Sequence, residues 1–265
     1  MSVTVPCSVI NAQSALAGTA PTASSWLILL HQGAWGDRPV DTLVPPQLHL
    51  WAQEHDCKIL LARTPQQAPT YPNNTYWFSD GGDQLRQGTL TTNGLPELGG
   101  AHLCGQMLLI CTNGKRDQCC ATFGRNLISE CAKSLSPEQF TRILECSHLG
   151  GHRFAPTGLW LPRNLALGRL NAASVQRLLA DHTVDSRYVR GSTSLSPAQQ
   201  VIQAHLWPVA AEFRSSAAVG NEIKFEVGIG EETETFIVEQ TVAQQVTSCG
   251  AEQKQSTTFR LVGRN

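Results

Sequence analysis

The chain has 265 residues, enough for one large or two small domains, and its formal net charge is -1. It has no basic run, and charged residues make up 15% of the sequence, which excludes an evident nucleic-acid interface and an extended disordered segment. The first ten residues lack the basic region and apolar core of a secretory signal, and the apolar run at 26–30 is too short to span a bilayer. We therefore expect a cytoplasmic protein with no nucleic-acid or membrane partner.

The first hundred residues predict an α/β unit. Residues 1–24 are small and polar, so we expect an arm with little regular structure. The apolar run at 26–30 has the length of a strand buried on both faces. Two prolines then precede an expected helix over 47–55, and short strands are expected at 58–62 and 76–78. Strand, helix, strand, strand is the order of a thioredoxin-like unit.

A glycine-rich stretch at 80–105 predicts a boundary before a second unit. This second unit should contain, in order, a strand ending at Cys111, a helix over 120–133, a strand ending at Cys146, a hairpin over 157–170 and a helix over 172–182.

The last third of the chain changes character after a polar segment at 185–191, which we expect to be a linker. Ser196-Pro197 predicts a helix start that continues past Pro208 toward Phe213. A hairpin is expected over 222–239 and a further strand at 257–262. This region holds no candidate ligand, and the sequence shows no internal repeat.

Two short segments concentrate the residues that can carry chemistry. They are Cys111-Thr-Asn-Gly-Lys-Arg-Asp-Gln-Cys-Cys120 and Glu145-Cys-Ser-His-Leu-Gly-Gly-His-Arg-Phe-Ala155. His148 and His152 would share a helix face, but a glycine costs about 1 kcal/mol in a helix interior, so the pair between them predicts a loop. Two thiolates with two imidazoles suit zinc or an iron-sulfur cluster. Eight residues lie between Cys111 and Cys120. This is too many for a zinc knuckle, in which about two to four residues separate the cysteines.

These segments resemble the sucrase/ferredoxin-like family, a branch of the thioredoxin-like 2Fe-2S ferredoxins in which two cysteines and two histidines hold the cluster. The resemblance extends more loosely to Cys7-Ser8 and to the stretches 16–22 and 161–169. The chain departs from the commonest family form at Asn113, where many relatives have His. Carried over by position, the resemblance implies that a 2Fe-2S cluster is bound by Cys111, Cys120, His148 and His152.

The resemblance also implies a fold and a function. It implies an α/β protein in which residues 101–183 form a thioredoxin-like ferredoxin domain. A thioredoxin-like α/β subdomain at 1–100 would precede it, and a small accessory helix and β-hairpin region at 184–265 would follow. The expected function is that of an electron carrier or redox-responsive protein rather than an enzyme, with an unknown protein as redox partner. Histidine ligation would raise the reduction potential above that of a four-cysteine ferredoxin.

Several alternatives stay open at this point. Cys119 or Cys146 can replace a neighbouring ligand or be a buried spare thiol, although the family pattern favours Cys120 over Cys119. Cys7 can be a further cluster-related thiol, although a structural role is favoured. The same four ligands can hold zinc in an interaction module. Hydrolysis, which the family name suggests, needs two carboxylates about 5 to 10 Å apart, and Glu145 has no obvious mate.

The nine cysteines themselves are expected to be thiols and metal ligands rather than a disulfide framework. Arg116 and Asp117 are expected either to pair with each other and fix the loop or to contact a partner.

Overall fold

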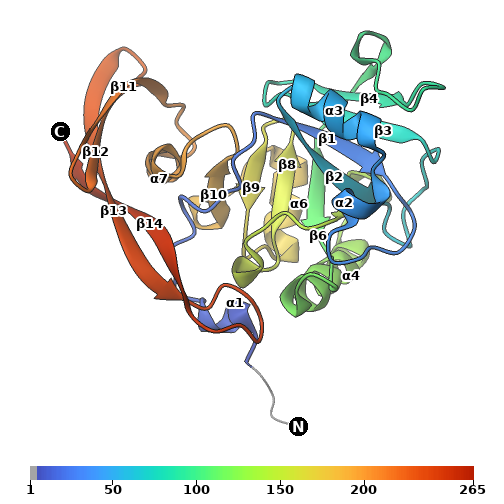
Figure 1. The fold of residues 1–265 in the computed structure, drawn as a ribbon, viewed down its shortest axis with the longest axis horizontal. Helices are drawn as coiled ribbons and strands as arrows, with labels where there is room; N and C mark the ends of the chain where they lie inside the picture. The colour runs from blue at the N-terminus through green and yellow to red at the C-terminus, as the bar shows by residue number, and fades with distance from the viewer. Residues whose placement is uncertain (1–4) are drawn as a thin grey trace.

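The computed structural model describes residues 5–265 (Figure 1). Its large sheet contains β1 (Ser25–Leu30), β2 (Cys57–Arg63), β3 (Thr75–Ser79), β4 (Leu85–Thr89), β5 (His102–Cys104), β6 (Met107–Cys111), β7 (Ile143–Cys146), β8 (Gly158–Leu161), β9 (Leu165–Leu167) and β10 (Val189–Ser192). The strand order is β10-β9-β8-β6-β7-β2-β1-β3-β4-β5. The expected α/β class is thus confirmed.

One topology occurs twice in this sheet. In the first half, β1 pairs in parallel with β2 and antiparallel with β3, and β4 and β5 continue outward. In the second half, β6 pairs in parallel with β7 and antiparallel with β8, and β9 and β10 continue outward. Antiparallel pairing of β2 with β7 joins the halves. The sequence shows no repeat, so this is a repeat of topology.

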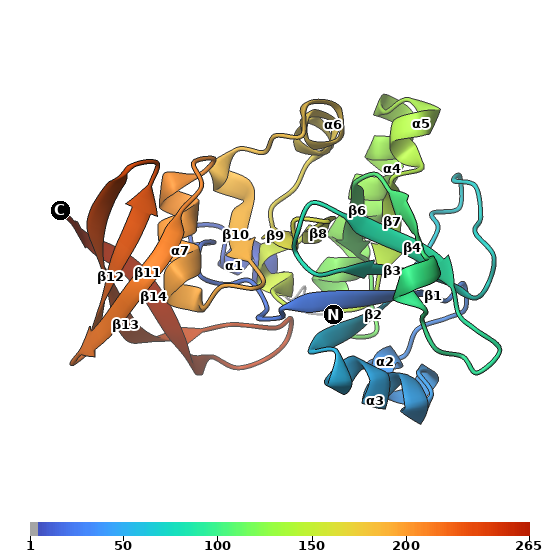
Figure 2. The ribbon, with the colours of Figure 1, turned by 90° about the horizontal axis from the view of Figure 1, so that it is seen from above.

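Helices cover the sheet on both sides. They are α2 (Pro39–Leu43), α3 (Pro46–Glu54), α4 (Arg125–Ser134), α5 (Pro137–Phe140) and α6 (Ala172–Asp181). Figure 2 shows α2 and α3 on the side opposite α4, α5 and α6. α3 begins at a proline, whose missing N–H costs nothing in a first turn. α5 begins with a capping box between Ser136 and Gln139.

Two cores form under these helices, and a third lies between the two halves of the sheet. Leu27 of β1 packs with Trp51 of α3, whereas Ile110 of β6 packs with Leu127 of α4. The opposite faces of β1 and β6 share the third core. The Trp26 indole N–H reaches across to Thr193 Oγ1 at 3.0 Å, which ties β1 to the end of β10. Every residue of β1 is buried as a result, as its unbroken apolar sequence predicts.

The C-terminal region is a second, four-stranded antiparallel sheet packed on one helix. It contains α7 (Pro197–Leu206), β11 (Glu212–Val219), β12 (Glu222–Ile229), β13 (Glu232–Gln245) and β14 (Lys254–Arg264) in the order β11-β12-β13-β14. Ile202 of α7 packs against Phe225 and Phe236 of the sheet. Near the other end of the chain, α1 (Cys7–Ile10) lies beside the connection from β13 to β14 (Figure 1).

Three expectations for the C-terminal third need correction. The expected linker at 185–191 is wrong, because Val189–Ser192 form β10. The expected helix does not reach Phe213, because α7 ends at Leu206, before Pro208, and Phe213 lies in β11. The expectation that the region holds no candidate ligand is also wrong, since Cys249 lies against Cys119.

The expected divisions of the chain fall inside the large sheet. The division after residue 100 separates β4 from β5, which pair, and the division after 183 separates β9 from β10, which also pair. Among the described helices, none is long and apolar enough to cross a membrane.

Candidate metal centre

Cys111 is the last residue of β6, a strand buried along its whole length. The chain returns to it through a π-helical turn at Cys120–Gly124, which continues into α4. A Cβ added to Gly124 would overlap the carbonyl oxygen of Cys111, so glycine allows the turn to approach the strand this closely. Turns of this kind are rare and occur often at functional sites. The result is that Cys111 and Cys120 lie side by side, each 1% exposed.

The loop between these cysteines is held by its own side chains. Asn113 Oδ1 accepts a hydrogen bond from the Lys115 N–H (3.2 Å), and its amide nitrogen donates to the carbonyl of Gly36 (3.1 Å). Both ends of this amide are therefore engaged, one within the turn and the other with the connection between β1 and α2. Asp117 Oδ1 accepts from the Cys119 N–H at 2.8 Å. Arg116 pairs with Asp37 rather than with Asp117, at 3.2 Å on the exposed surface.

The histidine segment follows β7 and is a loop, as its glycine pair predicts. Gly150 and Gly151 have φ values of +75° and +74°, a left-handed conformation that costs other residues about 1–2 kcal/mol each. A short 3-10 turn at His152–Phe154 follows. The two imidazoles thus face the same region, with ring centroids 5.2 Å apart.

Three of the four expected ligands converge on one point. The sulfurs of Cys111 and Cys120 and one ring nitrogen of His148 all lie within 4.8 Å of one another. His152 lies next to His148 but outside this group. Cys146 pairs with Cys111 across neighbouring strands and is fully buried, but its sulfur is also outside the group. The Cys119 sulfur lies instead in a second group, with Cys7 and Cys249.

The imidazole nitrogens bear most directly on what this site can bind. His148 Nδ1 and both ring nitrogens of His152 are buried without a hydrogen bond among residues 5–265, and His152 Nε2 has the Asp117 carboxylate oxygen Oδ2 at 3.5 Å. Buried polar atoms are nearly always paired, and an unpaired one costs about 1–3 kcal/mol. Two buried thiols next to unpartnered imidazoles are a donor set that fits zinc or an iron-sulfur cluster.

The two sulfurs are electrostatically unequal. The pKa of Cys111 is held well below the ordinary thiol value because the Cys120 thiol donates a hydrogen bond to it, with a further contribution from His148 and against the effect of burial. The pKa of Cys120 is raised by the same hydrogen bond and by burial. Burial also lowers the pKa of His152, an effect that the nearby Asp117 carboxylate partly offsets. These directions favour the thiolate of Cys111 and the neutral imidazole of His152, the forms in which these side chains bind metals.

Arg190 is a site residue that the sequence analysis missed. Its side chain is completely buried, and its guanidinium donates to the Gly150 carbonyl (3.0 Å), to Thr19 Oγ1 (3.2 Å) and to the Thr19 carbonyl. A Cβ on Gly151 would overlap this guanidinium. Burial lowers the pKa of Arg190 to about 9. Within the described chain it has no carboxylate partner. The one signal in the sequence was weak, a charged residue between Val189 and Gly191.

The carboxylates near the site have other partners. Glu145 accepts from the Arg63 guanidinium (2.7 Å) and from Thr112 Oγ1 (2.6 Å). Asp117 accepts from the backbone N–H groups of Cys119 and Cys249. Each carboxylate is therefore engaged in fixing a neighbouring segment, which leaves the hydrolytic alternative without a free pair at this site.

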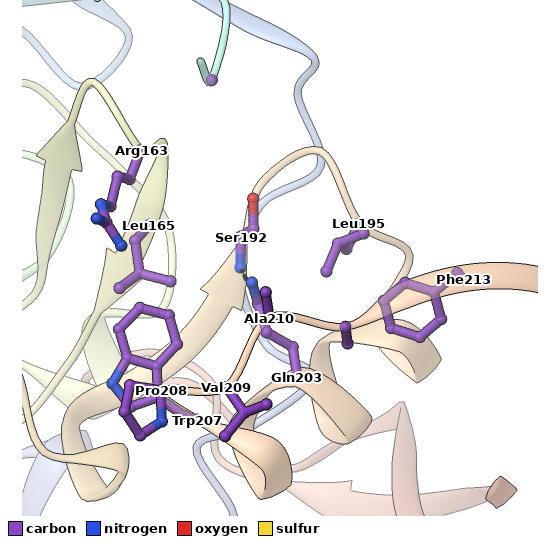
Figure 3. Close-up of a pocket in the computed structure, with 12 residues that line it drawn as sticks. Arg163, Leu165, Ser192, Leu195, Gln203, Trp207, Pro208, Val209, Ala210 and Phe213 are labelled. Carbon is purple, nitrogen blue, oxygen red and sulfur yellow. Dashed lines mark hydrogen bonds between the residues drawn. The ribbon is translucent and has the colours of Figure 1, made fainter. Parts of the chain in front are cut away.

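A separate cavity of about 270 Å³ lies where the end of α7 meets β9 and β10 (Figure 3). Its polar lining includes Arg163 and Gln203, and Gln203 Oε1 already accepts from the Ser192 N–H at 2.7 Å. Its lining residues, all in the described part of the chain, include no acid, histidine or cysteine. The cavity therefore presents no carboxylate, imidazole or thiol that could bind a metal ion.

Fold and site together define a mixed α/β protein whose buried cysteine and histidine side chains can bind metal. The chain belongs to the sucrase/ferredoxin-like family, whose profile matches residues 16–195. This match confirms the expected family and covers both ligand segments and Arg190, while Cys7 and Cys249 lie outside it. No curated protein and no solved structure matches the chain.

Proposed function

We propose that the protein is an electron-transfer or redox-responsive protein that carries one 2Fe-2S cluster bound by Cys111, Cys120, His148 and His152. The observation that supports this most is that buried ring nitrogens of both His148 and His152 lack a hydrogen bond among the described residues and lie beside two buried thiols. Family membership supports the same ligand set. We further propose that each half of the large sheet is a thioredoxin-like unit, on the basis of the β-α-β-β topology that both halves share.

The charge of Arg190 also supports an anionic group at this point. A buried cation is costly unless an opposite charge lies near it, and the described donors of Arg190 go to neutral oxygens. Burial lowers the pKa of this guanidinium, and the nearby sulfurs of Cys111 and Cys120 partly offset that effect. A 2Fe-2S cluster supplies a one-electron couple, and imidazole ligation raises its potential. Arg190 then has two roles: it holds the Gly150 carbonyl in place, and its charge favours the more negative, reduced state.

Zinc bound by the same residues is the second candidate. The convergence of Cys111, Cys120 and His148 within 4.8 Å would suit a single ion. Zinc held by these three residues would leave His152 without a ligand role, whereas the cluster proposal uses one of its ring nitrogens as a ligand.

The test is metal and sulfide analysis of protein purified without oxygen. We expect two irons and two acid-labile sulfides per chain, visible absorbance and an EPR signal after reduction with dithionite. The matched control is Cys111→Ser, which should lose iron, sulfide and colour together. A colourless protein that holds stoichiometric zinc in place of iron would refute the proposal.

A further inference from the structure

Three cysteines from distant parts of the chain meet outside the proposed cluster site. Cys7 lies in α1, Cys119 immediately precedes the π-helical turn, and Cys249 lies in the connection from β13 to β14. The sulfur of Cys119 is 3.5 Å from that of Cys7 and 3.2 Å from that of Cys249. The remaining pair, Cys249 and Cys7, is also 3.5 Å apart. All three sulfurs and a carboxylate oxygen of Asp117 lie within 4.8 Å of one another.

The surrounding groups hold these sulfurs in place. The N–H groups of Cys119 (2.8 Å) and Cys249 (2.9 Å) both donate to the Asp117 carboxylate, which fixes two of the three cysteines relative to one carboxylate. Ser8 Oγ donates to the Cys119 sulfur (3.3 Å), and the Cys7 N–H donates to the Cys249 sulfur (3.4 Å). Donors aimed at sulfur, and a carboxylate that orients ligand backbones, are the outer-shell partners usual around bound metals.

We propose that Cys7, Cys119 and Cys249 bind one Zn²⁺ ion, with Asp117 Oδ1 as the fourth ligand. In a tetrahedral zinc site with Zn–S bonds of about 2.3 Å, the sulfurs lie about 3.8 Å apart. The observed separations of 3.2 to 3.5 Å need an expansion of only a few tenths of an ångström. Asp117 Oδ1 is 3.9 Å from the Cys7 sulfur, a suitable distance for a neighbouring vertex.

The chemistry favours zinc at this position. Thiolates are the preferred ligands of structural zinc, and binding would release one proton from each of the three thiols. In an iron-sulfur cluster, at least two of the three cysteines would bind different irons. Their sulfurs would then lie further apart than the sulfurs around a single ion. The half-buried Arg153, whose Nε is buried without a hydrogen-bond partner among the described residues, interacts electrostatically with Cys7 and offsets part of the negative charge of the thiolates.

Such an ion would fasten three segments at the edge of the proposed cluster site. It would join α1, the loop that ends at Cys120 and the β13–β14 connection. Asp117 links the two sites, since its Oδ2 lies 3.5 Å from His152 Nε2. The C-terminal region would thereby be anchored over the histidine segment.

The test is zinc and iron analysis of the full-length protein purified without oxygen. The wild type should hold one zinc per chain in addition to iron, and Cys249→Ser should lower zinc at least tenfold while iron stays unchanged. Cys57→Ser, outside both groups, is the matched control and should change neither metal. Cys111→Ser should lose iron but keep zinc, so the two proposals can fail separately.

A second measurement uses the wild type alone, so that it still tests the proposal if the Cys249→Ser variant folds poorly. In the wild type, Cys249 should resist alkylation by iodoacetamide until a strong zinc chelator is added, as followed by peptide mapping. Equal alkylation with and without chelator, equal zinc in wild type and Cys249→Ser, or a Cys7–Cys119 disulfide in protein purified without oxygen and without chelator would each overturn the proposal.

Discussion

The two sulfur groups of this protein differ in how the chain assembles them. The proposed cluster ligands come from two segments within 111–155, each next to a strand of one sheet. The second group joins residues as far apart as Cys7 and Cys249, which are 242 positions apart. Asp117 touches both groups. Neighbouring cysteines can thus contribute to different groups, because the sulfurs of Cys119 and Cys120 lie in separate clusters of possible ligands.

The most direct test of this difference is to replace each of the two adjacent cysteines separately with serine. Cys120→Ser should lose all iron and sulfide and keep zinc, whereas Cys119→Ser should lose zinc and keep most of the iron, because their sulfurs lie in different groups. Metal analysis with visible absorbance measures both. Iron retained in Cys120→Ser and lost in Cys119→Ser would reverse the assignment. Cys146→Ser is the control and should keep both metals.

The glycine pair offers a second contrast, within the histidine loop itself. Gly151→Ala should destabilise the protein by about 3 kcal/mol or more and reduce cluster content, because its Cβ would displace the buried Arg190 from its partners. Gly150→Ala should cost about 1–2 kcal/mol, since it has the same φ but open space around a Cβ. Urea unfolding of the two variants measures the difference. Equal destabilisation would show that Arg190 does not hold this loop.

Much of the fold could be predicted from local pattern. The apolar run at 26–30 marked a strand buried on both faces, and Ser196-Pro197 marked the start of α7. The topological repeat could not be predicted, because it is a property of strand pairing that different apolar sequences satisfy equally well. β10 was missed because its central residue is an arginine, whose burial is explained by partners on other segments.

For the site, too, the sequence predicts what lies within short motifs and does not predict contacts between distant segments. The spacing of Cys111, Cys120, His148 and His152 lies within two short motifs, so a sequence can display it. Nothing near Cys249 in sequence indicates that it meets Cys7 and Cys119, since that meeting depends on where the β13–β14 connection packs.

Removal of the buried positive charge tests the electrostatic part of the account. Arg190→Gln should lower the reduction potential by roughly 59 mV, equivalent to a tenfold change in the one-electron equilibrium. The reason is that a neutral amide no longer favours the reduced state. Redox titration followed by EPR measures the shift, with Arg142→Gln, an exposed residue paired with Glu138, as the control. An unchanged potential in a variant that keeps its cluster would remove Arg190 from the tuning of the site.

The smallest effect is expected for the exposed ion pair between Asp37 and Arg116, which lies in the loop between Cys111 and Cys120. Arg116→Ala should change the free energy of unfolding by less than about 1 kcal/mol and leave both metals in place, because Arg116 pairs with Asp37 at the solvent-exposed surface. Thermal unfolding and metal analysis check this. Loss of either metal in Arg116→Ala would mean that the loop depends on this arginine more than its contacts indicate.

Histidine ligation of a cluster is the central claim, and it can be observed directly. Pulsed EPR on the dithionite-reduced protein, grown with ¹⁵N-histidine, reports nitrogen nuclei bound to the cluster. The account predicts couplings from two different imidazole nitrogens, one of which disappears in His148→Cys and the other in His152→Cys. A reduced protein that shows no imidazole coupling, or shows no EPR signal because it holds zinc alone, would contradict the account.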